Sequence, residues 1–484
     1  MAEVIPHWLT KQASLAPNDM ALELEDGNYL TFEQLKNKSQ SFAKKLVNQG
    51  VDRGSKVGIY STNCPEMVIA IHALSYLGAT AVMLNIRLAE QEIIYQLNDA
   101  DVSLILADDE LVSTVLDMEL NADVLSFSKV NSKQEMIVEL VTELSLDDPF
   151  TIMYTSGTTG NPKGVVHTYG NHWWSATGSA LNLGIHSTDK WLAVLPLFHI
   201  GGFSILLKSV IYGMPVLLLE KFNENTVQHA IMKRGVTIAS VVTVMLQRLI
   251  HKLDAEKYPD TFRCMLLGGG PVPESTLEIS NEKQLPVFQS YGMTETSSQI
   301  VTLSLSDALR KSGSAGKPLF PAQLRINNPN DEGVGEIVVK GPMVSKGYYK
   351  NIQANSNSFV DGWLLTGDLG KLDDEGFLYV VDRRNDLIIS GGENIYPSEI
   401  ESVLTSINGV HEAGVTGIED STWGQVPIAF IVSDSTISAK AILADAAKSL
   451  AKYKVPRKIY FVKELPRNAS NKLVRNKLTE LISE

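Results

Sequence analysis

The sequence is poor in cysteine and has no excess of positive charge, and both shortages narrow the class of protein. Only two cysteines, Cys64 and Cys264, occur in 484 residues, which excludes a disulfide framework or a cysteine-rich zinc site and fits a reducing compartment. The formal net charge is −13, so a broad basic face for nucleic acid or an anionic membrane is not expected. Polyanionic small molecules must therefore bind through local loops.

Long apolar runs and a secretory leader are also missing. The first residues, MAEVIPHWLTKQ, lack the apolar core of a signal peptide. The apolar stretch 203–219 is interrupted by Lys208, and the stretch 236–246 is too short to cross a bilayer. We therefore expect a cytoplasmic protein without membrane insertion.

The first 300 residues alternate short apolar strands with helical patterns. A helix is expected at 31–49, which opens with Thr-Phe-Glu-Gln, and strands are expected at 56–60 and 102–107. The alternation up to about residue 145 is repeated from 149 to about 300. It predicts the α/β class, with two layered α/β subdomains.

The pattern changes in the last third of the chain. Between about 313 and 381, glycine and proline separate short strands, which predicts a β-barrel-like subdomain. Residues after 386 have the pattern of a small α+β domain, with a helix starting at Pro397. We therefore expect an N-terminal domain at 1–384 and a C-terminal domain at 385–484, joined by a short hinge because no long linker appears.

The most specific segment is the loop TSGTTGNPKG at 155–164, which follows a β-like run at 150–154. Its glycines let backbone N–H groups face a polyanion, and its hydroxyls and lysine add donors and charge. It is not a Walker loop, because Pro162, Lys163 and Gly164 replace the required Gly-Lys-Ser/Thr. Its order and its place after a strand favour a phosphate-binding loop over a flexible surface loop.

The loop resembles the phosphate loop of the adenylate-forming acyl-CoA synthetases, the superfamily that also holds luciferases and peptide-synthetase adenylation domains. Five further segments match the family in its order: LPLFHIGG at 195–202, QSYGMTET at 289–296, TGD at 366–368, DRRNDLIISGGENIYPSEIE at 382–401 and PRNASNKL at 466–473. The resemblance implies that ATP activates a carboxylic acid as an acyl-adenylate, and that the thiol of coenzyme A then displaces AMP. It also implies a mobile C-terminal domain, with its hinge at Asn385.

The resemblance assigns a first group of residues to the nucleotide and its metal ion. The phosphates are expected at Thr155, Ser156, Gly157, Thr158, Thr159 and Lys163. The adenine pocket is expected at Gly269, Gly270, Pro271, Gln289, Ser290, Tyr291 and Gly292, with Tyr291 as a stacking face. Thr294 offers its hydroxyl to the α-phosphate, and Glu295 offers oxygen ligands to Mg²⁺. Asp368 and Arg383 are expected at the ribose.

A second group is assigned to catalysis and to coenzyme A. Lys472 is expected to reach the substrate carboxylate and the α-phosphate during activation, although by spacing alone it is a solvated lysine. His199 is expected to form a gate between the acyl pocket and the CoA channel; the alternative is a core histidine. Gly391 and Gly392 are expected to line the pantetheine channel. Thr294 and Glu295 can also be a helix start, with Thr294 as the cap.

The residues of four segments indicate a narrower group of enzymes within this superfamily. The segments LLGGGPVP, QSYGMTETSSQIVTL, DLIISGGENIYPSEIE and LPRNASNKLVRNKL are similar to the o-succinylbenzoate–CoA ligases of menaquinone synthesis. Their substrate carries two carboxylates, of which one is activated and the other must be recognised. Lys208 is alone in the apolar stretch FSILLKSVI, where it is either a snorkelling lysine or a counter-charge for the benzoate carboxylate. Ser298 and Thr243 are candidates for further hydrogen bonds to the acid.

Three alternatives remain open from the sequence. The first is another aryl- or medium-chain acyl-CoA ligase, and the second is a carrier-protein-loading adenylation enzyme, which the lack of a carrier domain after residue 484 disfavours. The third is a catalytically silent binding protein, which the intact Lys472, Glu295 and Asp368 disfavour. The sequence leaves the oligomeric state open, with a homo-oligomer among the alternatives.

Overall fold

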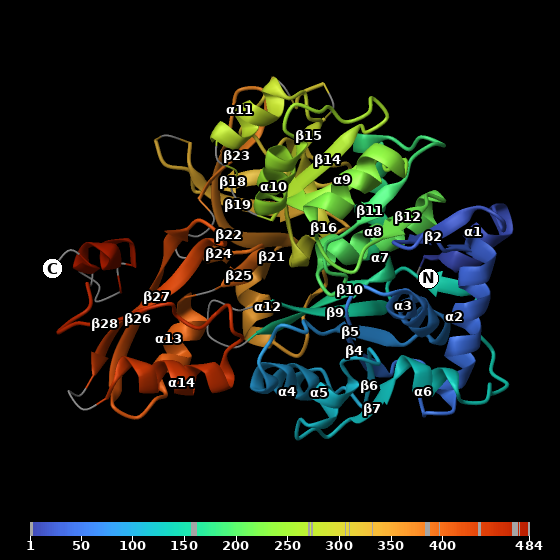
Figure 1. Ribbon diagram of the computed structural model, residues 1–484, viewed down its shortest axis with the longest axis horizontal. Helices are drawn as coiled ribbons and strands as arrows, with labels where there is room; N and C mark the ends of the chain where they lie inside the picture. The colour runs from blue at the N-terminus through green and yellow to red at the C-terminus, as the bar shows by residue number, and fades with distance from the viewer. Residues whose placement is uncertain are drawn as a thin grey trace. The chain divides into compact units, whose positions relative to one another are not determined.

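The computed structural model describes residues 3–482 apart from 156–161, 270, 271, 273, 305, 309, 332, 383–387, 396, 434–436, 467–472 and 474 (Figure 1). The chain forms two compact units. The first unit comprises Met1–Leu84, Leu97–Met153 and Gly164–Val381, and the second comprises Asn85–Gln96, Tyr154–Lys163 and Asp382–Glu484. The predicted hinge at Asn385 lies outside the described residues, so the domain boundary at 384/385 stays a prediction.

A seven-stranded sheet contains most of the strands expected in the first α/β subdomain. In spatial order they are β20 (Gly347–Tyr348), β10 (Lys163–Thr168), β9 (Pro149–Thr155), β5 (Thr80–Met83), β4 (Lys56–Tyr60), β6 (Leu104–Ala107) and β7 (Asp123–Ser126). The strands from β9 to β7 are parallel, whereas β20 is antiparallel to β10. Strands β5 and β6 are buried along their whole length, as parallel strands covered on both faces must be.

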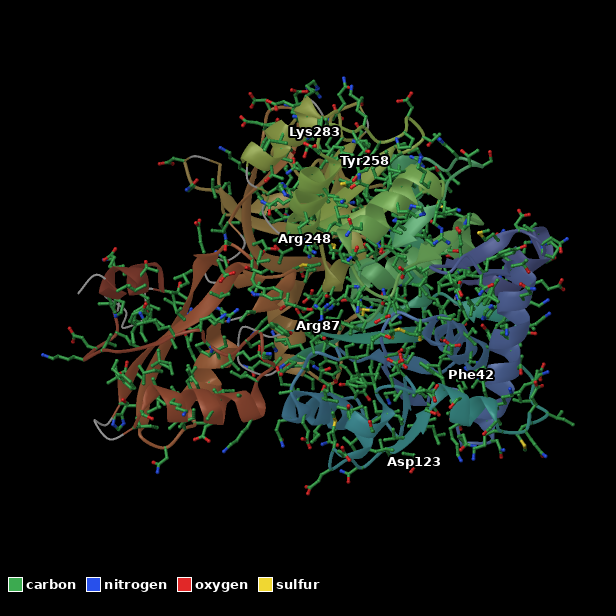
Figure 2. The ribbon with its side chains drawn as sticks, viewed as in Figure 1. Phe42, Arg87, Asp123, Arg248, Tyr258 and Lys283 are labelled. Atoms are coloured by element: carbon green, nitrogen blue, oxygen red, sulfur yellow. The ribbon has the colours of Figure 1, made fainter. Side chains whose placement is uncertain are left out.

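The helices in this part of the chain are α1 (Trp8–Leu15), α2 (Phe32–Val47), α3 (Pro65–Leu77), α4 (Glu90–Asp99), α5 (Val112–Leu116) and α6 (Phe127–Asn131). Most of α4 belongs to the second unit. A short sheet pairs β1 (Val4–Pro6) with β8 (Glu143–Ser145). Helix α2 starts because Thr31 and Gln34 form a reciprocal capping box. Its buried Phe42 meets the ring of Phe127 edge to face, with centroids 6.4 Å apart (Figure 2).

A nine-stranded sheet forms the second α/β subdomain. Its spatial order is β17 (Lys317–Pro318), β16 (Ser298–Thr302), β15 (Val287–Met293), β14 (Cys264–Gly268), β13 (Ile238–Val242), β11 (Trp191–Ala193), β12 (Val216–Leu218), β2 (Met20–Leu24) and β3 (Tyr29–Thr31). The strands from β15 to β2 are parallel, and the strands outside them are antiparallel. The associated helices are α7 (Tyr169–Leu183), α8 (Ile200–Tyr212), α9 (Glu224–Lys233), α10 (Thr243–Leu253) and α11 (Glu274–Glu282).

A β-rich subdomain completes the first unit. Strands β18 (Gln323–Asn327), β19 (Gly335–Lys340), β22 (Trp363–Leu372) and β21 (Phe359–Val360) lie in that order, and β23 (Leu378–Asp382) pairs with β22. The only helix described in this part of the first unit is α12 (Ile352–Ser358). The apolar core of the β-rich subdomain contains Ile337 and Val339 of β19 together with Ile300 and Val301 of β16. The β-rich sheet therefore packs directly on the end of the nine-stranded sheet.

The second unit is a small α+β structure. Its sheet has the order β25 (Glu393–Ile395), β24 (Ile388–Ser390), β27 (Gly424–Ser433) and β26 (Val410–Asp420), with β28 (Ile459–Phe461) paired to β27. Helices α13 (Pro397–Thr405) and α14 (Ala439–Ser449) cover one core, which includes Ile400, Val415 and Ile442. The 3₁₀ helix η2 (Arg475–Ile482) contributes Leu478 to a second core.

The predicted fold class is confirmed, with two α/β subdomains, a β-rich subdomain and a small α+β part. The expected helix at 31–49 is observed as Phe32–Val47, and the expected strand at 102–107 as Leu104–Ala107. No helix among the described residues is both long enough and apolar enough to cross a membrane.

Candidate active site

Lys208 is buried in the first unit rather than snorkelling to solvent. It lies on α8, which begins after His199, and only 2% of its surface is exposed. Its Nζ atom donates a hydrogen bond to Oε1 of Gln299 over 3.3 Å and lies 4.9 Å from the centroid of the Trp191 ring. Burial lowers the pKa of its ammonium to about 7. Among the described residues, no carboxylate forms an ion pair with Lys208.

Neutral side chains hold the two partners of Lys208 in place. The Gln299 amide Nε2 donates to Oγ of Ser179 over 3.2 Å, so its oxygen is directed at the lysine. The indole Nε1 of Trp191 donates to Oγ of Ser240 over 3.0 Å. The ammonium therefore faces one carbonyl oxygen and one ring, which leaves its charge uncompensated. A buried charge of this kind is suited to pair with an anion from outside the chain.

Two other predicted acid residues lie around the same helix. Ser298 opens β16, next to Gln299, and its Oγ lies 3.3 Å from Oγ of Ser204 on α8. His199 occupies the N-cap position of α8, is half-buried, and its ring meets the Phe198 ring edge to face at 4.8 Å. Ser298 therefore lies where β16 contacts α8, the helix that carries Lys208. His199 lies in the turn that leads into the same helix.

The turn that leads into α8 depends on glycine. A Cβ at Gly202 would overlap the carbonyl oxygen of Pro196, so the segment LPLFHIGG can fold back only with glycine there. The fourth acid candidate, Thr243, is the first residue of α10 and is half-buried. It follows β13, which pairs with the Trp191 strand β11.

Thr294 and Glu295 stand in a short 3₁₀ turn, η1 (Thr294–Thr296), and not at the start of a long helix. The expectation that Thr294 caps a helix is wrong: the N-cap is Met293, whose backbone N–H donates to Oγ1 of Thr296 over 2.9 Å. The capping role thus falls to the threonine two positions later. Thr294 is half-buried at the start of the turn.

Glu295 suits the role of a single carboxylate ligand for Mg²⁺. It is 7% exposed, and its Oε1 accepts a hydrogen bond from the hydroxyl of Tyr348 over 2.8 Å. The N–H of Ser345 donates to its carbonyl oxygen. The described residues hold no cluster of three or more histidine, cysteine or acidic side chains that could bind a metal. One carboxylate completed by substrate phosphates and water is the usual arrangement for Mg²⁺.

The chain reverses directly after this turn. Ser297 and Ser298 have positive φ angles of 55° and 117°, and β16 then runs antiparallel to β15. A Cβ at Gly292 would overlap the carbonyl oxygen of Ser298, so the hairpin closes only over glycine. Thr294 therefore lies in the connection of one tight hairpin, and Gln299, five positions later, lies in its second strand.

Asp368 lies in the predicted ribose position of the first unit. It is 6% exposed, and its Oδ2 accepts a hydrogen bond from the hydroxyl of Tyr291 over 2.8 Å. The Oγ1 of Thr366 accepts the N–H of Asp368 and donates to the carbonyl of Ile337. Tyr291 is only 3% exposed and packs in the core, so its ring has little surface to offer a base. In this structure its polar role is to orient Asp368.

The described part of the predicted adenine pocket is formed at the ends of β14 and β15. The Oγ of Ser290 donates to the carbonyl of Leu267 over 3.0 Å. Gly269 has a φ of +88°, a conformation that favours glycine. The Oε1 of Gln289 accepts the N–H of Gly313 over 2.9 Å.

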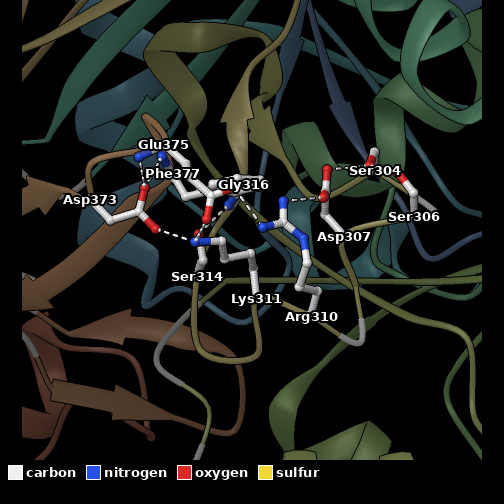
Figure 3. Close-up of polar contacts among 10 residues, drawn as sticks. All are labelled: Ser304, Ser306, Asp307, Arg310, Lys311, Ser314, Gly316, Asp373, Glu375 and Phe377. Carbon is white, nitrogen blue, oxygen red and sulfur yellow. Dashed lines mark hydrogen bonds and ion pairs between the residues drawn. The ribbon is translucent and has the colours of Figure 1, made fainter.

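Ion pairs fasten the loop that carries Gly313 (Figure 3). Arg310 donates to Asp307 and to Glu375, and Lys311 pairs with Asp373 and Glu375 over 2.7 and 2.6 Å. The Phe377 ring lies below these cations; its centroid is 4.8 Å from Nζ of Lys311, 5.3 Å from the guanidinium carbon of Arg310 and 4.5 Å from Nζ of Lys317. The loop before β17 is thus tied to the turn between β22 and β23, which fixes the contact with Gln289.

Several predicted residues lie outside the described ones. They are Ser156, Gly157, Thr158, Thr159, Gly270, Pro271, Arg383, Asn385 and Lys472. The flanks of the phosphate loop are described: Thr155 ends β9 and Lys163 begins β10. The loop therefore connects two strands of the seven-stranded sheet, as its place in the sequence predicts.

Gly391 and Gly392 form the turn between β24 and β25 in the second unit. Their φ angles are +57° and +86°. A Cβ at Gly391 would lie 2.8 Å from the ring of Trp423, and the N–H of Gly391 donates to the carbonyl of Trp423 over 2.8 Å. The turn therefore requires glycine and keeps its backbone close to a half-exposed indole ring.

Sequence reasoning missed the side chains that surround the predicted ones. Trp191 and Gln299 contact Lys208, and Tyr348 contacts Glu295. Gln299 lies next to the predicted Ser298, so its position was a usable signal. Nothing in the sequence near Trp191 or Tyr348 connects either residue to its partner, because each approaches from a distant element.

Two protein-family models match the chain. The family model described as AMP-binding enzyme matches residues 9–349, and the model described as AMP-binding enzyme C-terminal domain matches residues 399–472. The first match alone covers more than half of the chain.

Individual relatives are similar over their whole lengths. The 2-succinylbenzoate–CoA ligase of Oceanobacillus iheyensis is 58% identical, covering 99% of this chain and 100% of the relative, and that of Bacillus cereus is 50% identical, covering 100% of both. A double mutant of o-succinylbenzoate CoA synthetase from Bacillus subtilis, bound with a product analogue, is 47% identical with a TM-score of 0.94, covering 99% of this chain and 98% of that one. The same enzyme in complex with ATP and magnesium is 47% identical with a TM-score of 0.76, covering 99% and 100%.

Proposed function

The chain belongs to the AMP-binding, adenylate-forming enzymes, and on this premise we propose that it is a ligase that joins 2-succinylbenzoate to coenzyme A in menaquinone biosynthesis. The reaction uses ATP, releases AMP and pyrophosphate, and passes through an acyl-adenylate. The full-length relatives at 50–58% identity carry this activity in their names. A solved Bacillus subtilis relative, 47% identical, is a complex with the acyl-adenylate intermediate.

The observation that carries the choice of acid is the buried ammonium of Lys208. A fatty acid or a neutral aryl acid offers nothing to balance this charge, whereas 2-succinylbenzoate carries a second carboxylate. In this proposal the benzoate carboxylate pairs with Lys208, whose ammonium lies over the Trp191 ring. The aliphatic carboxylate is then the one that is activated. Ser298, Thr243 and His199 are the further residues we assign to the acid pocket.

In the first step, the activated carboxylate attacks the α-phosphorus of ATP and pyrophosphate leaves. Thr294 donates its hydroxyl to the α-phosphate, and Lys472 reaches the carboxylate and the same phosphate, so that negative charge is balanced as it develops. Glu295 would hold the magnesium ion, which offsets charge on the phosphates when it is bound. Asp368 and Arg383 hold the ribose, and the loop from Thr155 to Lys163 holds the departing phosphates.

In the second step, the sulfur of coenzyme A attacks the acyl carbonyl carbon and AMP leaves. Gly391 and Gly392 are the residues we assign to the pantetheine arm, since the turn that they form exposes backbone without a side chain of its own. In this proposal the chain has an N-terminal domain at 1–384 and a mobile C-terminal domain at 385–484 that turns about Asn385. A cytoplasmic location stays a prediction from composition, as does the oligomeric state.

An acid panel tests the function. Release of AMP is measured with purified protein, ATP and Mg²⁺, with and without coenzyme A, for 2-succinylbenzoate, benzoate, 4-phenylbutyrate and a medium-chain fatty acid. We expect 2-succinylbenzoate to exceed the other acids by at least two orders of magnitude in kcat/KM, with the thioester as product. A preference for a monocarboxylic acid would refute the proposed substrate, and transfer to a carrier protein but not to coenzyme A would refute the proposed acceptor.

A further inference from the structure

A chain of three buried polar side chains ends at the turn that carries Thr294. The His172 Nε2 lies 3.0 Å from Oγ1 of Thr151, and the same Oγ1 lies 3.0 Å from Nδ1 of His167. The Nε2 of His167 lies 2.7 Å from the carbonyl oxygen of Thr294. The exposed fractions of His167, Thr151 and His172 are 0%, 0% and 3%. None of the three appears among the residues that the sequence motifs assign to the reaction.

The Thr294 carbonyl, at the end of this series of hydrogen bonds, determines which atom donates in each of them. A carbonyl oxygen only accepts, so His167 must carry its proton on Nε2. Burial lowers the pKa of His167 to about 4, which keeps the ring neutral and leaves Nδ1 as an acceptor. Thr151 therefore donates its single proton to His167 and accepts from Nε2–H of His172. Burial also holds the pKa of His172 well below its ordinary value.

The hydrogen bond from His167 restrains η1, the turn that carries Thr294 and Glu295. The carbonyl of Thr294 also accepts the N–H of Ser297, so both of its lone pairs are occupied. The next carbonyl, that of Glu295, accepts the N–H of Ser345. Hydrogen bonds from two sides therefore hold the backbone of Thr294 and Glu295. Among the described residues, His167 is the only one whose side chain donates to the Thr294 carbonyl. Rotation of that peptide would move both the Thr294 hydroxyl and the Glu295 carboxylate.

We propose that His167 is a positioning residue for the activation step: its Nε2–H bond to the Thr294 carbonyl fixes the orientation in which Thr294 and Glu295 meet the phosphates of ATP. The inference rests on the proposed function for the identity of that step. The Thr294 carbonyl requires the Nε2–H tautomer of His167, and Thr151 supports it by donating to Nδ1. His167 touches neither substrate nor metal, so its effect on the rate passes through Thr294.

A variant series separates this role from that of an ordinary core histidine. His167→Leu removes the donor, whereas His167→Gln keeps an N–H at a similar distance from the backbone. Thr151→Val removes the hydroxyl that donates to Nδ1 of His167, and Thr151→Ser restores it. The matched control is His72→Leu, because His72 is a histidine of the same unit that is 3% exposed and whose pKa burial lowers to about 4. The described residues offer no hydrogen-bond partner to its Nε2.

The two half-reactions are measured separately, as pyrophosphate formed from ATP and acid, and as thioester formed from supplied acyl-adenylate. We expect His167→Leu to lower kcat for activation about 10- to 100-fold, the usual effect of losing a residue that orients a reacting group. Thioester formation should change far less, KM for the acid should stay close to the wild-type value, and His167→Gln should recover most of the rate. His72→Leu should leave the ratio of the two half-reactions unchanged.

Nitrogen-15 NMR of the histidine rings gives a readout that needs no substrate. Wild-type protein should show His167 as a neutral ring protonated on Nε2, and Thr151→Val should keep this tautomer because the Thr294 carbonyl still requires the donor. An Nδ1-protonated His167 in the wild type would overturn the proposal, as would full activation by a folded His167→Leu variant or an equal loss in both half-reactions. If the wild type does not activate 2-succinylbenzoate, the proposed substrate fails, and the ring spectra still decide the role of His167.

Discussion

The Nζ atom of Lys208 lies 4.9 Å from the centroid of the Trp191 ring, inside the first unit. A cation over an aromatic face is stabilised by about 0.5–2 kcal/mol, depending on how far it is desolvated. This is less than the cost of burying an unpaired charge, which is why the pKa of Lys208 falls to about 7. At neutral pH Lys208 is thus close to losing its proton, and the carboxylate that we propose as its partner would stabilise the charged form.

Replacing Lys208 by alanine should affect one class of acid. The second carboxylate of 2-succinylbenzoate loses its partner, and removing one member of such a buried pair costs about 2–5 kcal/mol, or roughly 30- to 5,000-fold in kcat/KM. ATP binds through other residues, so KM for ATP should change little. Steady-state kinetics with 2-succinylbenzoate measure the effect.

The control for this variant is an analogue that lacks the aromatic carboxylate. Wild-type protein should use it poorly, and Lys208→Ala should use it about as well as the wild type does. Lys208→Arg should keep much of the activity toward 2-succinylbenzoate because the charge and the donors remain. Equal losses with both acids would mean that Lys208 does not recognise the second carboxylate.

Binding of the dicarboxylate should weaken as the pH rises above 7. In the free protein the pKa of Lys208 is about 7, and a carboxylate beside it raises that pKa in the complex. The complex therefore binds more protons than the free protein between these two values, and affinity falls by up to about tenfold per pH unit in that range. Below pH 7 the ammonium is formed in both states, so this dependence disappears.

Calorimetric titration in buffers of different ionisation enthalpy measures the proton uptake directly. At pH 8 we expect uptake of a fraction of a proton on binding 2-succinylbenzoate and none from this group in Lys208→Met. The analogue without the aromatic carboxylate should show a flat profile between pH 7 and 9. A flat profile for 2-succinylbenzoate itself would contradict the pairing.

Tyr291→Phe should weaken the binding of ATP. The Tyr291 hydroxyl donates to Oδ2 of Asp368 over 2.8 Å, and a hydrogen bond to a charged group contributes about 1.5–3 kcal/mol. The variant loses one hydrogen bond that orients Asp368, the residue that we assign to the ribose, and we expect KM for ATP to rise roughly tenfold. KM for the acid is the internal control, and a comparable rise in that constant would indicate general damage to the fold.

Lys472→Ala should separate the two half-reactions. Lys472 lies outside the described residues, so the prediction rests on the match of PRNASNKL to the family. Loss of its charge should lower formation of pyrophosphate by several orders of magnitude, because it neutralises the reacting carboxylate and α-phosphate. Supplied acyl-adenylate should still be converted to the thioester. Parallel loss of both activities in a folded variant would remove Lys472 from this role.

Local signals in the sequence were sufficient for many elements and for the most unusual side chain. The Thr-Phe-Glu-Gln opening at 31–34 is a capping box that marks where α2 begins. Lys208 could be singled out because a lone charge in an apolar helix is itself anomalous. In both cases the information lies within one turn or one short segment of the chain.

Contacts between distant segments could not be predicted in this way. Trp191 reaches Lys208 from β11, and Tyr348 reaches Glu295 from β20. The cap at Thr294 was assigned wrongly because the turn begins one residue earlier, with Met293 as the N-cap, and Thr296 accepts the N–H of Met293. Such outcomes depend on tertiary packing, which has no signature in a short stretch of sequence.

The tight hairpin around Ser297 and Ser298 has a consequence for the size of acid that the enzyme accepts. One reversal of the backbone separates Thr294 from Gln299, the hydrogen-bond partner of Lys208. In the proposed reaction Thr294 faces the activated carboxylate and Lys208 faces the other one, so the spacing of the two carboxylates becomes a criterion of selection. We therefore expect a dicarboxylic acid that is longer or shorter by one methylene to be a poorer substrate, because it would not reach both ends at once.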